Sequence, residues 1–110
     1  MEVLFTTERL KRQLSSNTEL QRRWGEVGAK RIALRLQQLA AASTLADMRQ
    51  LPGRCHELTG DRDGHLALDL HNPYRLIIRP TANPAPTKED GGHDWDSVDS
   101  VTVTEIVDYH

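Results

Sequence analysis

Residues 52–79, PGRCHELTGDRDGHLALDLHNPYRLIIR, have the hydrophobic pattern of three successive β-strands and form the centre of the predicted fold. Leu66, Leu68 and Leu70 alternate with polar or small residues, as they do in a strand that buries one face. Pro73 interrupts the run, because proline fixes φ and has no amide donor. The pattern therefore predicts one strand on each side of this turn.

The same alternation continues after the turn. Tyr74, Leu76 and Ile78 predict the buried face of the next strand, and the residues between them predict its other face. A shorter strand is expected over residues 54–58, joined to the following strand by the turn 60–64, whose two glycines permit positive φ. These strands predict a small sheet, and we expect the functional residues at its polar edge.

Upstream of this sheet, the sequence predicts one strand and a first helix. Residues 2–5 resemble a short strand, and Thr6 or Thr7 can cap the following helix by accepting from its first-turn amides. That helix is expected over residues 8–24, with an interruption allowed at residues 15–17.

Gly25 and Gly28 predict the break to a second helix. Ile32, Leu36 and Leu39 then recur at i, i+4 and i+7, which gives one apolar helix face. The intervening polar residues are expected on the other faces of this helix: Arg31, Arg35 and Gln38. We therefore expect two antiparallel helices to cover one face of the sheet.

Downstream, residues 80–97 contain three prolines, two glycines and clustered acids, and they predict a long surface loop. Val101, Val103 and Val107 predict a last strand after it. The alternation slips near residues 105–106, which indicates a β-bulge or a strand end there.

The order of these elements, one strand, two helices and four strands, indicates a single two-layer α+β domain over residues 1–110. We expect the N-terminal strand and the two antiparallel helices to pack on an antiparallel sheet. No apolar run is long enough to cross a membrane, and no signal peptide is expected. Cys55 is the only cysteine, which excludes an internal disulfide and is typical of a cytoplasmic protein.

Charge is unevenly distributed along the chain. Residues 1–50 carry nine Lys and Arg against five Asp and Glu, whereas residues 51–110 carry five against eleven. The formal net charge is −2. A basic helical half on an otherwise acidic chain indicates an anionic partner.

The sequence has no zinc-ligand spacing, no glycine-rich phosphate loop before a helix and no recognisable serine nucleophile. It does contain a set of polar residues near the predicted strand ends: His56, Arg62, His71, Arg75, Arg79, Tyr109 and His110. Imidazoles exchange protons near neutral pH, and guanidinium groups stabilise charge on a phosphate. Such a set suits metal-independent RNA cleavage by attack of the 2′-hydroxyl on the adjacent phosphorus. From residue types alone, solvated arginines and an inert terminal Tyr-His pair are the simpler interpretation.

Several motifs in combination resemble HigB-type toxins of the RelE/ParE superfamily of bacterial toxin–antitoxin modules. The motifs are LPG (51–53), CHEL (55–58), GDR (60–62), NPYRLI (72–77) and EIVDYH (105–110), and the loop KEDGG (88–92) resembles one subgroup. This resemblance covers essentially the whole chain. It implies a microbial-RNase-like α+β fold, ribosome-dependent mRNA cleavage without a cofactor, and neutralisation by a helix-turn-helix antitoxin. Contact with operator DNA is expected only through that antitoxin.

The resemblance also implies site residues. His56 and His110 would form the acid–base pair, with Tyr109 orienting the base or sharing its role. Arg75 matches the arginine expected at the scissile phosphate. The sequence does not decide which histidine is the acid and which is the base.

Further residues are expected to bind substrate: Arg62, His71, Arg79 and Thr59. Arg62 matches the Gly-Asp-Arg turn, for which a structural role is the alternative. Thr59 stands where the family pattern usually has lysine, and Leu66-Ala67 stand where Trp-Ser is common. The loss of the lysine predicts an attenuated nuclease.

Two other functions are compatible with the sequence. The chain could be a non-enzymatic ParE-like toxin that grips a protein such as gyrase. It could also be an inactive relative that only occupies an antitoxin. The His-Arg-Tyr-His set favours the nuclease, and the missing lysine favours the non-enzymatic alternatives.

Overall fold

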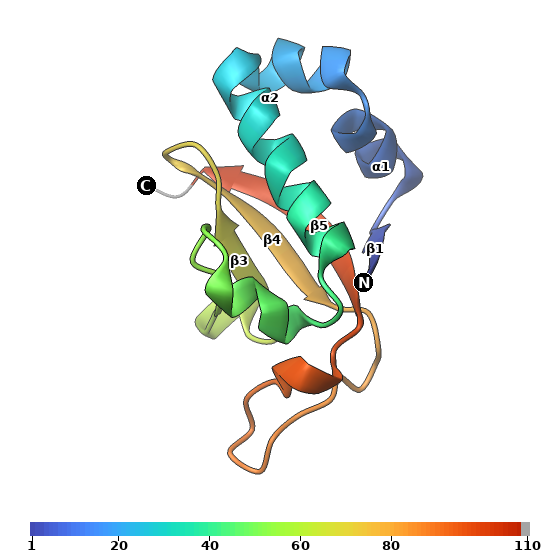
Figure 1. Ribbon diagram of the computed structural model, residues 1–110, viewed down its shortest axis with the longest axis vertical. Helices are drawn as coiled ribbons and strands as arrows, with labels where there is room; N and C mark the ends of the chain where they lie inside the picture. The colour runs from blue at the N-terminus through green and yellow to red at the C-terminus, as the bar shows by residue number, and fades with distance from the viewer. Residues whose placement is uncertain (109–110) are drawn as a thin grey trace.

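A single five-stranded sheet, in the order β1-β5-β4-β3-β2, forms one layer of the computed structural model, which describes residues 1–108 (Figure 1). The strands are β1 Glu2–Phe5, β2 His56–Glu57, β3 Leu66–Asp69, β4 Tyr74–Pro80 and β5 Ser100–Asp108. The α+β prediction is confirmed. The prediction of an antiparallel sheet is wrong for β1, which runs parallel to β5 while the other neighbours are antiparallel. Such a parallel pair requires a long crossover connection, and here the helices and the other strands lie between β1 and β5 in the chain.

Two helices form the second layer: α1 Glu8–Ser15 and α2 Asn17–Ala41. The Thr7 hydroxyl accepts from the Leu10 amide at 3.0 Å, and the Ser16 hydroxyl accepts from the Glu19 amide at 3.3 Å. Ser16 therefore ends α1 and caps α2, which divides the helix predicted over residues 8–24. The predicted break at Gly25 is a bend inside α2, where φ is 75° and ψ is 178°.

The core lies between α2 and the sheet, as Figure 1 shows. Its fully buried side chains include Ile32, Leu39, Leu66, Leu68, Leu76, Ile78, Val101 and Val103. Burial of each such side chain contributes about 1.5–3 kcal/mol. The apolar face predicted for β3 and β4 is therefore confirmed.

Arg35 was expected on a face of its helix other than the apolar one, yet it is only 3% exposed. Its Nε donates to the Asp69 carbonyl at 2.9 Å, and its Nη1 donates to the Gln38 side-chain oxygen at 3.1 Å. These two acceptors supply hydrogen bonds that water would otherwise provide, so the guanidinium can be buried.

The segment after β4 is less exposed than predicted. It includes the short helix η3 Trp95–Ser97, and Trp95 is only 6% exposed. The Trp95 indole donates to the Glu57 carboxylate at 3.0 Å, and the Arg49 guanidinium lies 4.2 Å from the centre of its ring. The loop is therefore held against β2 and against the helical turn η1 Leu45–Gln50.

The irregularity predicted near residues 105–106 is present one residue earlier. Ile77 pairs with Glu105 and Ile78 pairs with Val103, so Thr104 is the extra residue of a bulge in β5. No helix within residues 1–108 is both long and apolar enough to cross a membrane.

Candidate functional site

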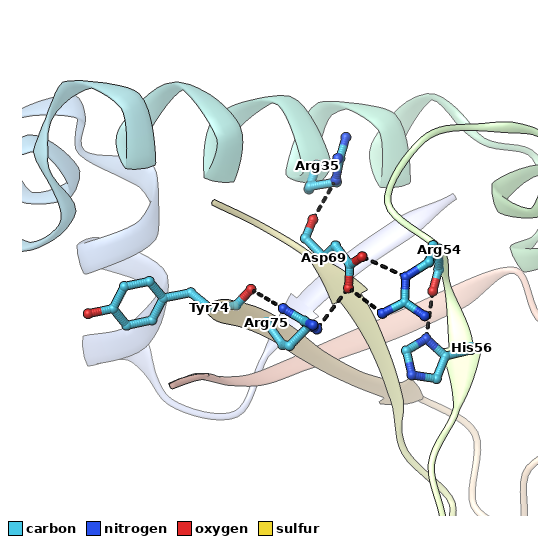
Figure 2. Close-up of polar contacts among 6 residues, drawn as sticks. All are labelled: Arg35, Arg54, His56, Asp69, Tyr74 and Arg75. Atoms are coloured by element: carbon cyan, nitrogen blue, oxygen red, sulfur yellow. Dashed lines mark hydrogen bonds and ion pairs between the residues drawn. The ribbon is translucent and has the colours of Figure 1, made fainter. Parts of the chain in front are cut away.

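The candidate site is centred on the Asp69 carboxylate, which lies between two arginines on the sheet face opposite the core (Figure 2). Arg54 donates to it through Nε and Nη2 at 2.8 and 3.2 Å. The Nε of Arg75 lies 2.8 Å from Oδ1, the carboxylate oxygen that Arg54 Nη2 also contacts. Asp69 and Arg75 are direct cross-strand partners of β3 and β4, so the sheet register itself brings this pair together.

The two arginines differ in exposure. The side chain of Arg75 is 19% exposed, whereas that of Arg54 is 65% exposed. Water screens the Arg54 pair more strongly, so Arg75 is the guanidinium whose position is better defined. Its Nη1 also donates to the Tyr74 carbonyl at 3.2 Å.

The turn before β2 places Arg54 beside Asp69. The Asp69 amide donates to the Gly53 carbonyl at 2.7 Å, and φ is 115° at Gly53 and 47° at Arg54. Positive φ is uncommon for a residue with a side chain. A Cβ atom at Gly53 would lie 2.8 Å from Arg35 Nε, so the buried arginine of α2 limits this position to glycine.

His56 lies next to this group on β2. Its Nδ1 is 2.6 Å from the Arg54 carbonyl, and since a carbonyl only accepts, Nδ1 carries a proton. In the neutral ring this leaves the lone pair on Nε2, which has no hydrogen-bond partner within residues 1–108. The site therefore contains an imidazole able to exchange a proton, next to guanidinium groups able to hold a phosphate.

Arg62 and Thr59 lie on the turn that joins β2 and β3, which contains the short helix η2 Gly60–Arg62. Arg62 pairs with Glu105 of β5, with 3.3 Å between Nη2 and the carboxylate oxygen. In the sheet register, His56 is the partner of Ala67, and Glu105 is the partner of Ile77. His56 and Glu105 therefore lie on the same face of the sheet as Arg75. Arg62 is thus brought to the same face as His56. Thr59 is exposed and makes no side-chain capping bond to η2.

The structure does not bring His71 to this group. His71 lies in the turn after β3, half-buried, with its ring against Gly28 of α2 and its centroid 4.7 Å from that of Tyr74. Burial, assisted by the charge of Arg31, lowers the pKa of His71 below its usual value of 6.5. This histidine therefore contributes to packing between the turn and the helix.

Arg79 lies at the far end of β4 from Arg75. It borders a separate hollow of about 380 Å³ whose lining includes His65 and His93. Tyr109 and His110, the two remaining residues expected in the site, lie outside the described residues.

Two residues of the site were missed from the sequence. Asp69 could have been found from the sequence. It alternates with the buried leucines of β3, and a tight turn between β3 and β4 places it opposite Arg75. Arg54 could not, since its place depends on a positive φ that arginine rarely adopts. Cys55, next to both His56 and Arg54 in the chain, is no candidate nucleophile, because burial raises the pKa of its thiol to about 12.

Among residues 1–108, no group of three or more His, Cys, Asp or Glu side chains is arranged to hold a metal ion. Comparison with protein-family models finds no family that matches the chain, and comparison with curated proteins finds no matching relative.

Proposed function

We propose that the chain is the toxin of a type II toxin–antitoxin module, a metal-independent endoribonuclease that cleaves mRNA on the ribosome and inhibits translation. The observation that carries this proposal is His56 beside the Arg54–Asp69–Arg75 group on the sheet face not covered by helices. That arrangement supplies a proton-exchanging ring and two phosphate-binding groups, which are the groups that cleavage through the 2′-hydroxyl requires.

In this proposal each residue has a definite task. The Nε2 atom of His56 accepts the proton of the attacking 2′-hydroxyl or donates one to the departing 5′-oxygen. Arg75 stabilises the negative charge that develops on the phosphate. The resemblance assigns the second proton-exchanging group to His110, assisted by Tyr109. Asp69 holds Arg75 in place before the substrate arrives.

The proposal also covers location and partners. The protein would act in the cytoplasm, bind ribosome-held mRNA, and be neutralised by a helix-turn-helix antitoxin that itself contacts the operator. Thr59 brings a hydroxyl where the resembling toxins carry an ammonium group, so the proposed nuclease is a weak one.

Replacement of Arg75 by alanine tests the proposal in a translating extract. We expect Arg75→Ala to lower mRNA cleavage by on the order of 10²-fold or more, because a charge-assisted contact to the transition state is removed. Asp69 keeps its pair with Arg54 in this variant, so folding should be preserved. Arg22→Ala is the matched control, since Arg22 is 68% exposed on α2 and pairs only with Glu19 among the residues described. Undiminished cleavage by Arg75→Ala would exclude Arg75 from the proposed active site.

A second candidate function is inhibition by binding alone. It is favoured by one observation, namely that Arg54 and Arg75 are both already paired with the Asp69 carboxylate. In that case the protein would arrest growth without shortening any mRNA. Mapping of mRNA ends after induction distinguishes the two functions, because only the nuclease produces new 5′ ends.

A further inference from the structure

A second hollow, of about 370 Å³, lies between the start of α1, the part of α2 just before its bend, and β5. The side chains that matter most in its lining are Thr7, Arg9, Gln13, Arg23, Trp24 and Glu105. Its volume is at the lower end of the range of about 300–1,000 Å³ found for small-molecule pockets. It therefore fits a single small group better than a helix or a folded partner.

The hollow contains two converging guanidinium groups. In the amide orientation that satisfies hydrogen bonding, the Gln13 side-chain oxygen accepts from Arg9 Nε at 3.2 Å and from Arg23 Nη2 at 3.1 Å. An amide brings no charge, so it holds these groups together without neutralising them. Within residues 1–108 Arg9 has no carboxylate within 4.0 Å, and Arg23 has only that of Glu19, at 3.7 Å. The two arginines therefore attract an anion to this position.

Other groups in the hollow suit a nucleobase. Trp24 is half-buried and contributes an indole, on which any base can stack. Glu105 lies at the border of the hollow, and its carboxylate could accept from the exocyclic amino group of a base. An acidic peptide would use the two arginines but would gain nothing from the indole and would be repelled by Glu105.

The hollow adjoins the candidate site through the same Glu105. That residue borders the hollow and also pairs with Arg62 on the face that carries His56. β1 pairs with β5 only as far as Val103, so the strand segment between the two sites is not covered by β1.

We propose that this hollow binds one nucleotide of single-stranded RNA, with a phosphate between Arg9 and Arg23 and a base against Trp24. The choice of RNA rests on the proposed function, and the nucleotide bound here would flank the one that is cleaved. The hollow is then a binding subsite that fixes the position of the RNA strand.

Binding of a short 2′-O-methyl oligoribonucleotide tests this proposal, because that probe has no 2′-hydroxyl and cannot be cleaved. Arg9→Ala/Arg23→Ala should weaken its binding about tenfold and lower the salt dependence of binding by about 0.7 in log–log slope, the value for one phosphate contact. Arg12→Ala/Arg22→Ala removes the same charge from the same helices outside the hollow, and should change affinity no more than about twofold.

Gln13→Glu is the sharper variant. It keeps the size of the side chain but places a carboxylate between the two arginines, so it should leave the fold intact and still weaken oligonucleotide binding about tenfold. The probe should also quench the fluorescence of Trp24, and Trp24→Phe should lose that part of the signal. Equal losses in the two double variants, or an unchanged affinity in Gln13→Glu, would overturn the proposal. A polyglutamate peptide that binds as tightly as the oligonucleotide and depends on the same arginines would overturn it as well.

Failure of this subsite and failure of the nuclease proposal give different results. Arg75→Ala should abolish cleavage and still allow quenching of Trp24. If Arg75→Ala cleaves normally while the effects of Gln13→Glu are as expected, only the assignment of the active site is wrong. If Trp24 is not quenched while Arg75→Ala loses cleavage, only the subsite is wrong.

Discussion

Two groups of arginines on this protein differ in what holds them. Arg54 and Arg75 meet at the Asp69 carboxylate, whereas Arg9 and Arg23 meet at the neutral amide of Gln13. A carboxylate orients a guanidinium strongly but offsets part of the positive charge, whereas an amide orients it weakly and leaves the whole charge for a ligand. The first arrangement suits a group that must be positioned before a reaction, and the second suits a group that attracts the ligand.

Among the substitutions considered, removal of the charge at Asp69 should have the largest effect, because it abolishes the difference between the carboxylate-held and the amide-held arginines. Asp69→Asn would turn the carboxylate-held group into an amide-held one while keeping the size of the side chain. Under the proposed function, we expect RNA cleavage to fall by on the order of 10²-fold, because a misplaced catalytic group costs about that much. Binding of an uncleavable RNA should instead become tighter, because a negative charge is lost beside two arginines.

Cleavage rate and oligonucleotide affinity, measured on the same preparation of Asp69→Asn, check this prediction. The control is Asp96→Asn, which removes an acidic charge from the exposed residue at the middle of η3. A variant in which rate and affinity both fall would show that Asp69 only supports the fold.

Replacement of Gly53 should disturb the carboxylate-held group through its backbone. Gly53→Ala introduces a Cβ 2.8 Å from Arg35 Nε at a φ of 115°, and should lower the free energy of unfolding by about 2 kcal/mol. Gly60 also has a positive φ, 69°, but an added Cβ there would meet no atom within 4 Å. Gly60→Ala should therefore lower the free energy of unfolding by only about 1 kcal/mol. Urea unfolding of the two variants measures the difference. An equal decrease in the free energy of unfolding of the two variants would mean that the contact of the new Cβ with Arg35 does not affect stability.

A positive charge introduced at Thr59 should increase the cleavage activity proposed for the candidate site. Thr59 is exposed beside η2, so Thr59→Lys should change stability by no more than about 0.5 kcal/mol. An ammonium group stabilises phosphate charge better than a hydroxyl, so cleavage of ribosome-bound mRNA should rise by about tenfold. Thr59→Gln, similar in length to Lys but uncharged, is the control. The absence of any gain would indicate that another residue supplies this charge or that the protein acts by binding.

The smallest effect should come from His71, which belongs to neither arginine group. Its pKa is lowered on folding, so folding favours the neutral ring. Above pH 6.5, the usual pKa, the ring is neutral in both states and the stability is at its full value. As the pH falls below that value, the unfolded chain takes up a proton more readily than the folded one, so stability is lost. Urea unfolding at pH 7.5 and 5.5 should therefore show a larger loss for the natural chain than for His71→Asn. A proton NMR titration of His71 with a midpoint above 6.5 would contradict this account.

The strands and caps could be read from the sequence because they depend on local pattern. Leu66, Leu68 and Leu70 alternate with a period of two, and Thr7 occupies a typical cap position, so short stretches decide both features. The bulge at Thr104 could be approached in the same way, since the alternation of apolar residues passes from Val101 and Val103 to Ile106.

The parts that could not be predicted depend on partners distant in sequence. The parallel pairing of β1 with β5 joins residues almost 100 positions apart, and the alternation of four residues does not fix its direction. Arg35 looks like a solvent-facing residue until the Asp69 carbonyl, 34 residues later, is placed beside it. The hollow at Gln13 likewise needs α1 and α2 in place before Arg9 and Arg23 converge, and β5 to complete its lining.

The position of β5 has a consequence for synthesis of the chain on the ribosome. β5 lies between β1 and β4 in the sheet, and it is the last of the described elements to be translated. Until residues 100–108 have emerged, β1 has no neighbouring strand, β4 lacks one of its two neighbours, and the core lacks Val101 and Val103. Such non-local pairing delays folding until β5 has been translated. A nascent chain of this fold therefore cannot complete its sheet, nor the face that carries the Asp69 group, before β5 has been translated.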